Sequence, residues 1–174
     1  MKPFGIAVLF ALCMSTVAQN TSSAETIDWV LRFDGIGAVK VGMTLRQVNA
    51  ALGEKFSTPK DKDEQTCFYV EPTKHPDTAI MVLNGRVARV DVFAVNGAQP
   101  RTATLEGVQI GDSEPMVQKL YGEAVAVSPH HYTDGQYLTV KSGEYGLRFE
   151  TAQGKVTSFY AGSVKAIGFV EGCS

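Results

Sequence analysis

The densest group of side chains that could carry chemistry is the segment Pro129–Gly135, which reads PHHYTDG. His130 or His131 could bind a metal ion together with Asp134, and the same side chains could serve a hydrolase. Adjacent side chains on an extended segment point to opposite sides, so two neighbouring histidines rarely bind one ion. We therefore interpret the segment as a polar loop that ends in an Asp-Gly turn, and we expect no metal there.

Other arrangements that carry catalysis do not occur in the sequence. It contains no Gly-x-Ser-x-Gly nucleophile elbow and no phosphate-binding glycine loop. The scattered Asp and Glu residues lack the spacing of a glycosidase pair. We predict a non-catalytic protein that needs no cofactor, and a hydrolase built on the His130–Asp134 loop is the alternative.

Residues 1–18 have the pattern of a cleaved signal peptide. Lys2 is followed by an apolar run from Phe4 to Val17, and a small residue, Ala18, precedes the expected cleavage point. The run is about 14 residues long, whereas a membrane-spanning helix needs about 20. Cleavage after Ala24 is the alternative. We expect a periplasmic or secreted protein with no transmembrane segment in the mature chain.

Two cysteines remain in the expected mature chain, Cys67 and Cys173. In an oxidising compartment such a pair is most simply one disulfide, although two free thiols are the alternative. The bond would close a loop of about 107 residues and would stabilise the fold by roughly 4 to 5 kcal/mol.

The charge balance of the mature chain bears on its partners. Loss of Lys2 with the signal peptide leaves 15 basic and 18 acidic residues, a net charge of −3. Phosphate backbones require a basic patch, and the sequence has none. We therefore expect a protein partner rather than a nucleic acid.

The chain contains a sequence repeat with an offset of 69 residues. VKVGMTLRQVNAALG, from Val39, aligns with VQIGDSEPMVQKLYG, from Val108. The same offset aligns Phe68 with Tyr137, Ile80 with Phe149, Gly85 with Gly154, and Val90 with Phe159. The repeat predicts a tandem duplication. We assign residues 19–34 to an N-terminal segment with a leading strand, 35–103 to a first unit and 104–174 to a second.

Each unit is expected to begin with a short helix. Thr44 and Gln47 form a capping box, and Gly53 ends the first helix. Ser113 is the expected cap of the second helix, which Gly122 ends. Helices of about nine residues do not persist alone, so each must dock its apolar stripe on a sheet.

The strands of each unit follow its helix. Asn84-Gly85 predicts a hairpin of strands 79–83 and 86–94, and Gln153-Gly154 predicts one of strands 147–152 and 155–162. Strands 66–70 and 136–140 precede them, and a terminal strand, 164–170, delivers Cys173. Alternation places Ala88, Val90 and Val92, and likewise Thr157, Phe159 and Ala161, on the core side. The predicted fold is α+β, two tandem helix-plus-antiparallel-sheet units with the helices packed on one face of the sheet.

The opposite face of the sheet is a candidate binding surface. Aromatic and arginine side chains on an exposed face are typical of interface hot spots. The candidate partner-binding residues on this face are Arg89, Asp91, Phe93, Arg148, Glu150 and Tyr160, and a second candidate surface is the loop with His130, His131 and Tyr132. The alternative is that these side chains only keep an open antiparallel face soluble.

The segment VGMTLRQVNAALG resembles the helix-opening motif of the SmpA/OmlA and beta-lactamase-inhibitor-protein (BLIP-like) group, in which a hydrophobic-Gly-Met-Thr-x-x-x-Val stretch begins each unit. In the second unit Asp112-Ser113 replaces Met-Thr. The resemblance implies an exported, non-catalytic protein whose sheet or loops bind another macromolecule. We expect a protein-interaction module, such as an inhibitor or immunity-type factor. The alternative is a structural envelope component that binds outer-membrane proteins or peptidoglycan.

Overall fold

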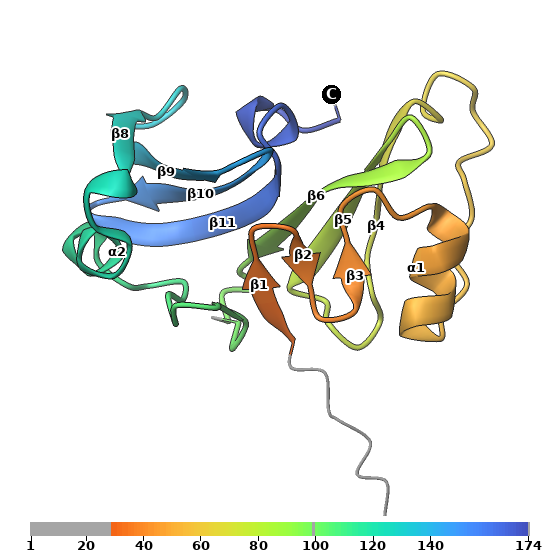
Figure 1. Cartoon of the computed structure of the whole chain (residues 1–174), viewed down its shortest axis with the longest axis horizontal. Helices are drawn as coiled ribbons and strands as arrows, with labels where there is room; N and C mark the ends of the chain where they lie inside the picture. Colours follow the sequence, from red (N-terminus) through yellow and green to blue (C-terminus); the bar gives the residue numbers. More distant parts are fainter. Residues whose placement is uncertain (1–28, 99, 174) are drawn as a thin grey trace, which may run out of the picture.

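The computed structural model describes residues 29–98 and 100–173, so the predicted signal peptide lies outside the described part of the chain. The fold is mixed α+β and consists mostly of sheet. In the described residues, one sheet has seven strands in the order β4-β5-β6-β11-β10-β9-β8 (Figure 1). Their bounds are β4 Cys67–Val70, β5 Thr78–Leu83, β6 Arg86–Phe93, β8 Ala126–Pro129, β9 Gln136–Ser142, β10 Tyr145–Ala152 and β11 Lys155–Ser163.

A smaller sheet contains the predicted leading strand. Its strands are β1 (Val30–Arg32), β2 (Gly35–Ile36), β3 (Val39–Lys40) and β7 (Ala103–Thr104), in the order β3-β2-β1-β7. β1 pairs with β2 antiparallel and with β7 parallel. The leading strand is therefore confirmed, and it joins this second sheet rather than the large one.

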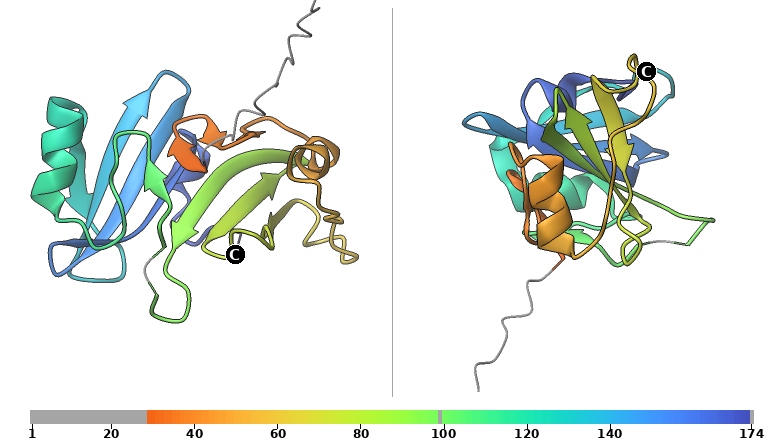
Figure 2. Two further views of the ribbon diagram at one scale, coloured as in Figure 1. Left: turned by 90° about the horizontal axis from the view of Figure 1, so that it is seen from below. Right: turned by 90° about the vertical axis from the view of Figure 1, so that its right-hand side faces the viewer.

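Two α-helices follow the predicted pattern, with different caps. α1 (Leu45–Leu52) has the predicted capping box between Thr44 and Gln47. α2 (Glu114–Tyr121) begins after Ser113, whose side chain makes no capping hydrogen bond, so this cap was predicted wrongly. The two 3₁₀ turns are η1 (Gly122–Ala124) and η2 (Ala166–Gly168). Figure 1 and the left view of Figure 2 place α1 and α2 at opposite ends of the molecule.

The main core lies on one face of the large sheet. Val48 of α1 and Val117 of α2 are both fully buried in the same hydrophobic cluster. The sheet contributes Phe68, Val70, Ile80, Val82, Val87, Val90, Val92, Leu138, Leu147, Phe149, Val156, Phe159 and Ala161 to it.

Both predicted hairpins are present, and each contains a β-bulge. Asn84 and Gly85 have φ of 51° and 75°, and Gln153 and Gly154 have φ of 52° and 74°, as a tight two-residue turn requires. Ala88 in β6 and Thr157 in β11 are the extra residues at the register shifts. A bulge reverses the side-chain alternation, so the prediction that Ala88 and Thr157 face the core was wrong.

Contacts 69 residues apart recur in the two halves. The N–H of Gly42 donates to the carbonyl of Val87, and that of Gly111 donates to Val156, both at 2.8 Å. The N–H of Val87 donates to Met43, and that of Val156 donates to Asp112, again both at 2.8 Å.

The offset does not hold for the third strand of each half. Val70 pairs with Ile80, whereas Leu138 pairs with Phe149. These pairings match β4 with β9 at an offset of 68. The predicted alignment of Phe68 with Tyr137 is therefore wrong, because a slip of one residue turns a side chain to the other face.

The predicted terminal strand 164–170 is also wrong. This segment holds η2 and then crosses the second face of the sheet, opposite the main core. β11 already lies between β6 and β10, so it offers no free edge with which a following segment could pair. Ile167 instead packs at Gly146, where an added Cβ would lie 2.3 Å from its Cδ1 atom.

Candidate binding site

Arg89 attaches the C-terminal segment to the second face. Its Nε and Nη2 donate to the carboxylate of Asp91 at 2.6 and 2.8 Å, and Nη2 also donates to the Tyr69 hydroxyl at 2.7 Å. Nη1 donates to the carbonyls of Ala166 and Phe169 at 3.1 and 2.8 Å. All five N–H donors of the guanidinium therefore have an acceptor.

The surroundings of Arg89 are buried, which corrects part of the predicted surface. Arg89 and Tyr160 are each only 4% exposed, and the guanidinium carbon lies 4.4 Å from the centre of the Tyr160 ring. Burial, followed by the Asp91 charge, raises the pKa of Tyr69. Burial also raises the pKa of Asp91, although the Arg89 guanidinium opposes this shift. These groups form an internal network, because the chain's own C-terminal segment covers them.

The other predicted residues of this face are half-buried. Glu150 accepts hydrogen bonds from Ser158 at 3.0 Å and from Tyr160 at 3.1 Å. Arg148 donates to Thr139 at 2.9 Å and lies over the Tyr137 ring. Phe93 pairs with Ser158 across the strands. This part of the face is thus a mutually paired polar layer.

His130 folds its own loop. Its Nδ1 accepts hydrogen bonds from the backbone N–H groups of Tyr132 and Thr133 at 3.1 and 3.2 Å. The ring stacks on Tyr137 at 4.5 Å, and Nε2 lies 3.6 Å from the Glu150 carboxylate. These contacts leave His131 and Tyr132 exposed at the end of the loop, where their rings meet edge to face at 4.6 Å.

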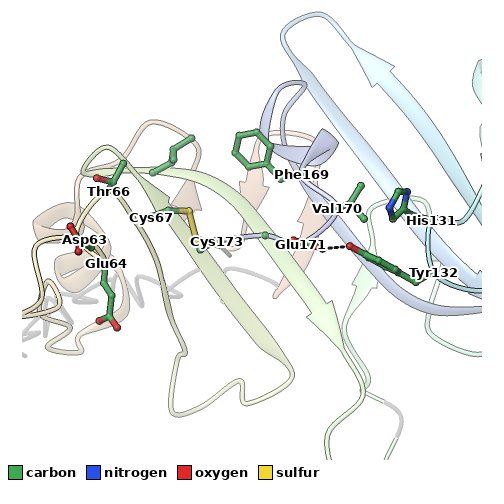
Figure 3. A pocket seen from close by; sticks show the side chains of 12 residues that line it. Asp63, Glu64, Thr66, Cys67, His131, Tyr132, Phe169, Val170, Glu171 and Cys173 are labelled. Carbon is green, nitrogen blue, oxygen red and sulfur yellow. Dashed lines mark hydrogen bonds between the residues drawn. A yellow bond between two sulfur atoms is a disulfide. The ribbon is translucent and has the colours of Figure 1, made fainter.

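His131 and Tyr132 form one side of a hollow of about 770 Å³, which we call the tail hollow (Figure 3). Its lining consists of Asp63, Glu64, Thr66, Cys67, Leu83, His131, Tyr132, Phe169, Val170, Glu171, Gly172 and Cys173. The Tyr132 hydroxyl donates to the Glu171 carboxylate, and this hydrogen bond raises the pKa of Tyr132. The loop of the second half thus contacts the C-terminal segment.

The predicted disulfide between Cys67 and Cys173 is present and lies in the wall of the tail hollow. It ties the C-terminal segment to the start of β4, across 106 residues of sequence. Disulfides are typical of proteins that fold outside the reducing cytoplasm. Asp63, Glu64, Val170 and Glu171 were not predicted as site residues, although the pairing of Cys173 with Cys67 brings their segments together.

Two further searches covered only the described residues. No group of three or more His, Cys, Asp and Glu side chains is arranged to hold a metal ion there. Within the same part of the chain, no helix combines the length and the apolar character needed to cross a membrane.

Comparisons with known proteins give little more. No protein-family model matches the chain, and no curated protein matches it. Among solved structures, the chain is similar to the crystal structure of a DUF4309 family protein (YjgB) from Bacillus subtilis. The two are 16% identical with a TM-score of 0.49, and the match covers 78% of this chain and 88% of that one.

Proposed function

We propose that this chain is an exported, non-catalytic protein-interaction module, an inhibitor or immunity-type factor, that binds an envelope or secreted protein through the tail hollow. Export follows from the predicted signal peptide at residues 1–18 and is supported by the Cys67–Cys173 disulfide. The hollow replaces most of the sheet face that the sequence indicated, because that face is covered.

The observation that carries the proposal is the exposure of apolar side chains at the rim of a fixed hollow. Tyr132 is 60% exposed and Val170 is 37% exposed, and both line it. Aromatic side chains in a pocket that is partly desolvated are the usual anchors of protein interfaces. The disulfide and the Tyr132–Glu171 hydrogen bond hold the rim in place, which lowers the entropy lost on binding.

We also propose that the chain is a tandem duplication related to the BLIP-like plan. The recurrence of the Gly42–Val87 and Gly111–Val156 hydrogen bonds supports this, as do the two bulges at Ala88 and Thr157. In this view the tail hollow lies where the two units meet, and it combines the loop of one with the cysteine of the other.

The contacts of His130 favour binding over the hydrolase alternative. A catalytic histidine needs a free nitrogen to exchange a proton with a nucleophile or a water molecule. Nδ1 of His130 is engaged by two backbone N–H groups, and Nε2 faces Glu150, which itself accepts hydrogen bonds from Ser158 and Tyr160. The imidazole is therefore used to shape the loop that presents Tyr132.

A capture experiment tests the proposal. The oxidised chain without residues 1–18 is immobilised and exposed to an envelope extract and to a secreted fraction. We expect a Y132A/V170S variant to retain at least ten-fold less of the captured partner, since interface anchors contribute about 2 kcal/mol or more. The matched control is L105S, which removes a side chain that is 60% exposed and does not line the hollow.

Equal capture by Y132A/V170S and by the unchanged chain would contradict the proposal. Capture of peptidoglycan or outer-membrane fragments, lost in the same variant, would instead favour the structural envelope component. Steady hydrolysis of a substrate that stops in an H131A variant would support the hydrolase.

A further inference from the structure

The proposed function leaves the chemistry of the partner open, and the tail hollow narrows it. We propose that the partner presents an extended segment with lysine or arginine side chains next to aliphatic ones. This inference rests on the proposed function and specifies what the hollow binds. It follows from the charge of the lining, its apolar surface and the way both are arranged.

The lining carries negative charge. Among its twelve residues, all in the described part of the chain, Asp63, Glu64 and Glu171 are acidic, and none is lysine or arginine. In the described structure the carboxylates of Asp63 and Glu64 form no ion pair, whereas Asp34, Asp91 and Glu150 all have a basic side chain within 4.0 Å. A cation brought to Asp63 and Glu64 therefore need not displace an existing partner.

The lining is also apolar over a continuous stretch. Leu83 and Phe169 are half-buried, and they pack in the cluster that holds Met81 and the two bonded cysteines. Val170 and Tyr132 extend this surface toward the loop. An acidic surface alone would attract any cation, but this combination favours a chain with alternating basic and aliphatic side chains.

The two kinds of surface lie in sequence across the hollow. Figure 3 shows Asp63 and Glu64 at one end, Tyr132 and His131 at the other, and the disulfide with Glu171 between them. An extended peptide repeats its side-chain direction every second residue. A segment that lies along the hollow can thus place basic groups near Glu64 and Glu171 and an aliphatic group near Val170.

The exposed carboxylates are expected to set rate and selectivity more than total affinity. Charge pairs at a solvated rim steer the encounter and are screened by salt within about 8 Å at physiological ionic strength. The apolar anchors supply most of the remaining binding free energy. Binding of the partner should therefore weaken as salt is added, without being abolished.

The test uses defined peptides on the oxidised chain. The probe is an acetylated, amidated VKLKV peptide, with VELEV and VQLQV as matched controls, and the readout is NMR chemical shifts of the protein amides. We expect VKLKV to shift residues 63–67, 131–132 and 169–173, and to bind about ten-fold more weakly to D63N/E64Q/E171Q, since each exposed ion pair is worth up to about five-fold. The E171Q change keeps an oxygen that accepts from Tyr132.

The control for net charge is E71Q/E123Q/E144Q, which neutralises three exposed carboxylates that do not line the hollow. This variant should bind VKLKV as the unchanged chain does. Equal shifts from VELEV, shifts centred elsewhere, or no shifts from VKLKV at millimolar concentration would each overturn the inference.

Failure of the inference and failure of the proposed function can be told apart. If the partner is captured and lost in Y132A/V170S, but its retention does not change in D63N/E64Q/E171Q or with added salt, the hollow is a binding site for a partner of different chemistry. If VKLKV binds the hollow but Y132A/V170S captures as much partner as the unchanged chain, the proposed function fails instead.

Discussion

The two halves of the large sheet use the same backbone contacts but close their second faces differently. In the first half, the C-terminal segment covers Arg89 and Tyr69 and is tied to β4 by a disulfide. In the second half, the His130 loop covers Tyr137 and Glu150 through its own hydrogen bonds and ring stacking. Position 89 is arginine, and position 158, which lies 69 residues later, is serine.

This difference shows how one framework can be specialised without a change in its strands. The core-facing residues of both halves are apolar and fully buried, because packing constrains them. The second face is free to vary, provided that each polar group finds a partner. The tail hollow forms where one kind of covering ends and the other begins.

Removal of the disulfide should have the largest effect and should act on the first half. We expect the C67S/C173S variant to lose about 4 to 5 kcal/mol of unfolding free energy, because the bond closes a loop of about 106 residues. Urea denaturation measures this loss. Hydrogen exchange should rise in residues 164–173 and in β4, while β9 and β10 stay protected. Uniform loss of protection in both halves would show that the coverings are not independent.

Replacement of the arginine should come next. In an R89M variant, Asp91 and the carbonyls of Ala166 and Phe169 lose their donor, which we expect to cost about 3 to 4 kcal/mol. The matched change in the second half is S158A, which removes one hydrogen bond to Glu150 and should cost about 1 kcal/mol. Thermal or urea unfolding gives both values. Similar costs for the two variants would refute the contrast between the coverings.

The loop of the second half should be less costly to disturb. An H130A variant removes the acceptor of the Tyr132 and Thr133 backbone N–H groups and the stack on Tyr137, which we expect to cost about 2 kcal/mol. H131A, at an exposed neighbouring position, is the control and should be nearly neutral. Exchange rates of the amides at 132 and 133 should rise only in H130A.

The helix caps offer the smallest contrast. A T44A variant breaks a capping box and should lose about 1 kcal/mol of stability, whereas S113A should lose only a few tenths because its hydroxyl caps nothing. Chemical denaturation of the two variants under the same conditions compares them. A larger loss in S113A would mean that this hydroxyl has a role that its geometry does not indicate.

The sequence predicts the features that depend on neighbouring residues. Asn84-Gly85 and Gln153-Gly154 define hairpins because turns need positive φ, and Thr44 with Gln47 defines a helix start. The cysteine pair follows from parity and compartment. The bulges escape notice because an extra residue leaves no mark in an apolar strand such as 86–93.

The covered face could not be predicted, because its contacts join distant residues. Arg89 bonds to carbonyls 77 and 80 residues later in the chain. The segment 164–170 contains Val, Ile and Phe, which fit a strand or a packed covering equally well, and only the positions of β6 and β10 decide between them. Asp63 and Glu64 lie in a charged loop whose proximity to Glu171 depends on that covering.

The bulges at Ala88 and Thr157 have a consequence for self-association. Beyond each bulge the strand continues past the residues at which β6 and β11 pair with each other, and Val87 and Val156 there use both their N–H and their carbonyl groups on the chain that precedes a helix. Unsatisfied strand edges recruit strands from other molecules and begin aggregates. In this protein two such edges are occupied internally, so the centre of a wide sheet offers no template on which a second copy could polymerise.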